Sequence, residues 1–130
     1  MTRRKLLAAL AGIAVVVLVG PVALARESAK DLDRMTYLKF THPVTLPGVE
    51  LAAGTYLFEL PDPMGAFEVV RVSSEDRRTV YYMAFTRIVE RPNGLRPGEV
   101  ISFGETRANA PQPITAWWPS GKSTGREFIY

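Results

Sequence analysis

Apolar and polar residues alternate in short runs along most of the chain, and residues that form turns separate these runs. In residues 55–60, Tyr56, Phe58 and Leu60 share one face at a period of two, which is typical of a half-buried strand. Nine runs of this kind together predict about eight short strands. They cover residues 35–40, 44–46, 49–51, 55–60, 67–73, 79–89, 99–106, 114–118 and 126–130.

The prolines and glycines between the runs also indicate the fold class. Residues 26–130 hold nine prolines and eight glycines, spaced too closely for a long helix. We therefore expect an all-β fold, a single antiparallel β-sandwich of the immunoglobulin-like or prealbumin-like kind, with a small closed barrel as the alternative. The run 79–89 is apolar on both faces, which is typical of a central strand. The predicted core consists of Tyr56, Phe58, Val70, Val72, Met83, Phe85, Ile101, Phe103, Ile114 and Phe128.

The beginning of the chain has a different pattern, that of a signal peptide. A basic segment at 3–5 precedes an apolar run at 6–19, and residues 23–25 read Ala-Leu-Ala, the small-x-small pattern before a signal peptidase site. We expect a signal helix that touches the membrane only transiently and an exported product, periplasmic or extracellular. The arginine pair also allows the twin-arginine route beside the general one.

Cleavage is predicted between Ala25 and Arg26. It would leave a polar segment at 26–34 followed by the β domain at 35–130. An uncleaved anchor is the alternative, because residues 6–25 are about as long as a membrane-spanning helix.

Charge and composition narrow the classes of function. Three of the 16 basic residues lie in the leader, which leaves 13 basic and 13 acidic residues in the remaining chain. A neutral domain gives no reason to expect nucleic acid as a partner. The chain has no cysteine and one histidine, His42, so disulfides, thiolate ligands and a histidine metal cluster are excluded. We expect neither a metal nor another cofactor.

Two stretches carry a family resemblance. Residues 40–49 (FTHPVTLPGV) and 51–58 (LAAGTYLF) are similar to an F-x-x-P-V-x-L-P-G-V and L-x-A-G-T-Y-x-F frame found in small exported bacterial proteins of uncharacterised function. The stretches 103–106, 114–117 and 125–130 are similar as well, so the resemblance extends over nearly all of the chain after the leader. It implies an exported all-β protein and brings no activity or catalytic residues.

Two aromatic pairs are the candidate binding residues: Trp117 with Trp118, and Tyr81 with Tyr82. Neighbouring residues on a strand point to opposite faces, so one ring of each pair is expected in the core and the other partly exposed. Exposed aromatic rings commonly hold sugar rings or partner proteins. The alternative is that both tryptophans are structural and cover the sandwich.

No catalytic residue is predicted. Glu105 and Glu127 form the alternative, a pair of carboxylates that could hydrolyse an envelope polysaccharide if the fold brought them together across a cleft. The leading hypothesis is an exported, non-enzymatic β module that binds or supports a protein or glycan of the periplasm or cell envelope. Pairing of the last strand with a second copy would make a homo-oligomer.

Overall fold

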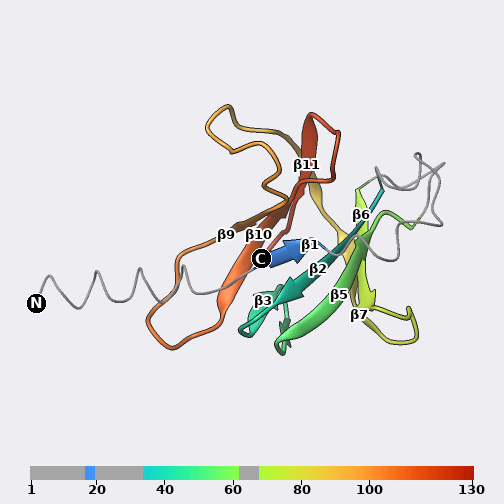
Figure 1. Ribbon diagram of the computed structural model, residues 1–130, viewed down its shortest axis with the longest axis vertical. Coiled ribbons are helices and arrows are strands. Elements are labelled where there is room, and N and C mark those ends of the chain that lie inside the picture. The colour runs from blue at the N-terminus through green and yellow to red at the C-terminus, as the bar shows by residue number, and fades with distance from the viewer. Residues whose placement is uncertain (1–16, 20–33, 62–67) are drawn as a thin grey trace, which may run out of the picture.

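The computed structural model describes residues 17–19, 34–61 and 68–130. Within these ranges the chain forms strands joined by turns (Figure 1). The strands make two separate, open sheets, so the all-β prediction is confirmed in its sandwich form. Over the same residues, no helix is long and apolar enough to span a membrane.

The first sheet is antiparallel throughout, with the strand order β1-β2-β5-β6-β7. Its strands are β1 (Val17–Val19), β2 (Met35–Phe40), β5 (Gly54–Glu59), β6 (Val69–Ser74) and β7 (Val80–Phe85). The β6–β7 hairpin turns at the charged residues 75–78. There Arg77 adopts a left-handed φ of 64°, and Asp76 accepts hydrogen bonds from the Ser74 hydroxyl and the Arg78 amide.

The second sheet has the order β4-β3-β10-β11-β8, and β9 pairs with β10 as well. Its strands are β3 (Val44–Leu46), β4 (Val49–Leu51), β8 (Arg87–Glu90), β9 (Ile101–Phe103), β10 (Gln112–Trp117) and β11 (Thr124–Glu127). The β3–β10 pair is parallel. The hydroxyl of Tyr130 lies 3.0 Å from the Thr45 carbonyl oxygen and 2.8 Å from that of Ile114, so it links these two strands.

The core lies between the sheets and draws on both. Phe58 of β5 is fully buried, and its ring lies 6.1 Å from that of Trp117 in β10. Phe103 packs against the core while partly buried. Seven further predicted core residues are buried in it: Tyr56, Phe58, Val70, Val72, Ile101, Ile114 and Phe128.

The prediction of one long central strand at 79–89 is wrong. The run divides at Thr86 into β7 and β8, which are edge strands of different sheets. The backbone amide and the hydroxyl of Thr86 both donate to the carbonyl oxygen of Glu68. These two bonds fix the point at which the chain crosses between sheets.

Part of the predicted signal helix is a strand in the structure. Val17–Val19 forms β1 and pairs with β2, with Leu18 opposite Lys39. The rest of the leader, and with it the predicted cleavage site at Ala25 and Arg26, lies outside the described residues.

Candidate functional site

Both tryptophans are buried, so the prediction that one of them is exposed is wrong. Trp117 has no exposed surface and donates its indole N–H to the Thr36 hydroxyl at 3.1 Å. Trp118 is 4% exposed and donates its indole N–H to the Ser102 hydroxyl at 2.8 Å. Its ring lies against Gly125, and the Arg91 guanidinium carbon is 6.0 Å from the ring centroid. The pair is structural, which is the alternative considered above.

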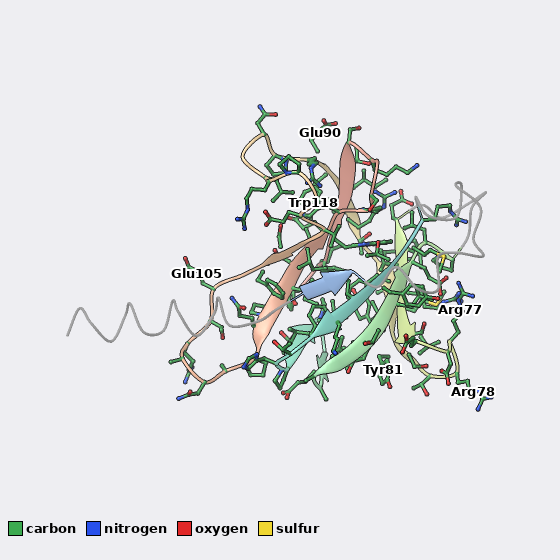
Figure 2. All side chains as sticks on the ribbon, viewed as in Figure 1. Arg77, Arg78, Tyr81, Glu90, Glu105 and Trp118 are labelled. Atoms are coloured by element: carbon green, nitrogen blue, oxygen red, sulfur yellow. The ribbon has the colours of Figure 1, made fainter. Side chains whose placement is uncertain are left out.

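The tyrosine pair divides into a half-buried and an exposed ring, although the β6–β7 register shift at this point interrupts the regular alternation. Tyr82 is half-buried, and its ring lies 5.7 Å from that of Phe128 in the core. Tyr81 is 40% exposed and makes an edge contact with Tyr56 at 5.3 Å. Tyr81 and Trp118 are well separated in the molecule (Figure 2), so the two aromatic pairs do not form one binding surface.

The two carboxylates of the hydrolase hypothesis occupy different surroundings. Glu105 is exposed in the loop after β9 (Figure 2). Glu127 lies in β11, where its carboxylate accepts a hydrogen bond from Arg87 at 2.7 Å. The Arg87 contact offers a structural role for Glu127. Nothing in the described geometry joins the two glutamates across a cleft.

His42 is exposed, and its Nδ1 lies 3.0 Å from the Thr41 hydroxyl. In the described part of the chain, no three His, Cys, Asp or Glu side chains gather closely enough to hold a metal ion.

A surface that the sequence prediction missed lies on β7. Val80, Met83 and Phe85 are 52%, 55% and 66% exposed. Met83 and Phe85 were predicted in the core, and this is wrong, because Tyr82 pairs with Val72 and Ala84 with Val70, which turns Tyr82 and Ala84 inward. The register shifts between Val72 and Ser73, so Val80 pairs with Ser73 and lies on the same side as Met83 and Phe85. We call Val80, Met83 and Phe85 the β7 face.

The β7 face lies at the edge of its sheet. Within the described residues β7 pairs with β6 alone, so one side of its backbone has no strand partner. Residues 79–86 carry no charged side chain. Natural edge strands are commonly protected by charges, prolines or coverings, so an uncharged apolar edge is a candidate interface.

A buried glutamate paired with two partly exposed arginines borders this face. Glu59 of β5 is 7% exposed, and its carboxylate lies 2.8 Å from Arg71 and 3.5 Å from Arg77. Arg71 is directly opposite Met83 in the β6–β7 register. The β7 face thus has guanidinium groups at its border, and a mixture of apolar side chains and arginine is typical of protein interfaces.

The raised pKa values of three tyrosines predict how the stability of the protein changes at alkaline pH. Burial is the largest cause that raises the pKa values of Tyr56, Tyr82 and Tyr130 above the ordinary 10.0. Above pH 10 these tyrosines ionise more readily in the unfolded chain than in the folded one, so the free energy of unfolding should fall as pH rises. Urea melts from about pH 8 to about pH 11 should show constant stability at first and then a decline. Stability that rises above pH 10 would contradict the raised pKa values of these tyrosines.

Relatives offer no independent guide to this surface. Comparison of the chain with models of known protein families, with curated proteins and with solved structures finds no match in any of the three.

Proposed function

We propose that the protein is an exported, non-enzymatic β-sandwich module that binds a partner protein of the periplasm or cell envelope through its β7 face. The observation that carries this proposal is the exposure of Val80, Met83 and Phe85 on one edge strand. The β7 backbone is already held in a sheet, so docking costs little backbone entropy, and burial of the three side chains releases water from apolar surface.

The chemistry of the face favours a protein over a glycan. Sugar rings stack on flat aromatic platforms, and both tryptophans that could have provided one are buried. Met and Phe side chains instead suit an apolar protein surface, and Met adapts its shape to irregular partners. Arg71, whose side chain is 31% exposed, can add hydrogen bonds at the border of the interface.

The leader supports a role outside the cytoplasm. The basic segment at 3–5, the apolar run and the Ala-Leu-Ala motif support export. The resemblance to small exported all-β proteins points the same way. Export would place the β7 face where it can bind a protein of the periplasm or cell envelope.

Substitutions on the β7 face should abolish partner binding while the fold is retained. We expect Phe85→Ser and Met83→Ser each to weaken binding about tenfold or more, because truncating a buried interface anchor costs over about 1.4 kcal/mol. Protein purified from the envelope with its bound partner allows the affinity of each variant to be measured by titration. The matched control is Ile129→Ser, which alters an apolar residue of similar exposure, 48%, elsewhere on the molecule. Equal loss in all three variants, or no loss in the β7 variants, would contradict the proposal.

A further inference from the structure

The outer edge of β2 is occupied by a strand from the leader. β1 pairs antiparallel with β2, with Val17 opposite Phe40, Leu18 opposite Lys39 and Val19 opposite Leu38. On its other side β2 pairs with β5 along its whole length. β2 therefore has two strand partners, and one of them precedes the predicted cleavage site.

The backbone of Lys39 faces the leader strand. The amide of Leu60 donates to the carbonyl oxygen of Arg34 at 2.9 Å, which fixes Arg34 as a residue whose backbone points to the β5 side. Backbone direction alternates along a strand, so Lys39, five residues further on, directs its N–H and C=O away from β5 and toward β1. Its side chain is exposed, whereas those of Leu38 and Phe40 are buried.

We propose that the β2 edge is a strand-docking site, which the leader strand fills in the uncleaved chain and an extended segment of a partner protein fills after cleavage. This inference rests on the export and cleavage in the proposed function. Removal of residues 1–25 would take β1 away and leave the Lys39 amide and carbonyl unpaired. A strand added to a sheet edge gains main-chain hydrogen bonds for affinity and side-chain contacts for specificity.

The register defines the chemistry of the segment that fits. It runs antiparallel to β2, and the positions opposite Leu38 and Phe40 are apolar, as Val19 and Val17 are in the leader. The position opposite Lys39 is apolar or acidic, because an opposite charge stabilises a cross-strand pair. A second copy of β2 fits less well, because a lysine on an edge strand acts against pairing between identical edges.

The first test uses a disulfide in the full chain, which has no native cysteine. Leu18→Cys combined with Lys39→Cys should form an intramolecular disulfide on mild oxidation, because paired strands hold opposite Cα atoms about 5.5 Å apart, within the range a disulfide bridges. The control pair, Leu18→Cys with Lys122→Cys, places the second cysteine in an exposed turn outside the β1–β2 register and should not form it. Equal disulfide yields in the two pairs would overturn the pairing on which this inference rests.

The second test measures strand docking on the cleaved protein recovered from the envelope. The probe is a peptide of residues 14–20 (AVVVLVG) with two lysines added at each end for solubility. We expect Lys39→Pro to weaken peptide binding about tenfold or more, because proline removes the N–H that points to the docked strand. Lys39→Thr retains that N–H and should stay within about threefold of wild type. In the peptide, Leu18→Glu should bind at least as well, and Val17→Asp should not bind.

The outcomes separate this inference from the proposed function. Circular dichroism melts establish that each Lys39 variant is folded before binding is compared. Peptide binding that is unchanged in Lys39→Pro, or absent in the folded wild type, would overturn the docking site and leave the β7 face untouched. An intact mass that begins before Arg26 would refute cleavage, whereas the cysteine pair would still report on β1–β2 pairing.

Discussion

Replacement of Phe58 by alanine is expected to lower the free energy of unfolding by about 3–5 kcal/mol. Phe58 has no exposed surface, and its ring lies 6.3 Å from that of Phe40, 6.1 Å from Trp117 and 6.4 Å from Phe128. Because its neighbours come from both sheets, truncation opens a cavity between the layers as well as removing buried apolar surface. Urea melts of the purified protein measure the loss.

The chain offers a matched control for this experiment. Phe85→Ala removes the same atoms from a side chain that is 66% exposed, and it should change stability by less than about 0.5 kcal/mol. A loss below about 1 kcal/mol for Phe58→Ala, or equal losses at the two positions, would mean that Phe58 does not point into the core between the sheets.

The second large effect is expected at Gly125, where alanine should destabilise the protein by about 3 kcal/mol. A Cβ atom at this position would lie 2.1 Å from Cε3 and 2.5 Å from Cζ3 of Trp118. The indole would have to move, and the move would break its 2.8 Å hydrogen bond to the Ser102 hydroxyl. Urea melts give the loss, and a red shift of tryptophan fluorescence would report exposure of the ring.

Gly94→Ala is the control for Gly125→Ala. No atom lies within 4 Å of a Cβ built at Gly94, so that variant should stay within about 0.5 kcal/mol of wild type. If Gly125→Ala were as stable as Gly94→Ala, the close packing of Trp118 on the β11 backbone would be refuted.

The fold class could be predicted from the sequence because strand period and turn residues act locally. Residues 35–40, 44–46 and 49–51 were predicted with the bounds that the structure has. The break at Thr86 could not be predicted in this way. A period-two pattern is the same for one long strand as for two short strands in line, and the two hydrogen bonds from Thr86 to the Glu68 carbonyl depend on tertiary structure.

The candidate site was less predictable than the fold. Both faces of β7 are apolar, so alternation alone could not decide whether Tyr82 and Ala84 or Met83 and Phe85 point inward. The pairing with β6 settles this in favour of Tyr82 and Ala84. The absence of charge from residues 79–86 was the available signal, and it fits an edge strand with a partner as well as it fits a central strand.

The tryptophan pair was misjudged for a related reason. Alternation correctly places neighbours on opposite faces of a strand, but an outward ring is exposed only if nothing covers it. Trp118 is covered because a glycine lies against its ring and Arg91 lies over the ring. Such coverings bring together residues far apart in sequence, and no local pattern reports them.

Photocrosslinking in living cells tests the proposed binding role most directly. A benzophenone amino acid placed at position 85, on the β7 face, is predicted to form a covalent adduct with one protein in the envelope fraction. The same group at position 129, where the native side chain is 48% exposed, is predicted to form none. Adducts at both positions in equal yield, or at position 129 alone, would contradict binding through the β7 face.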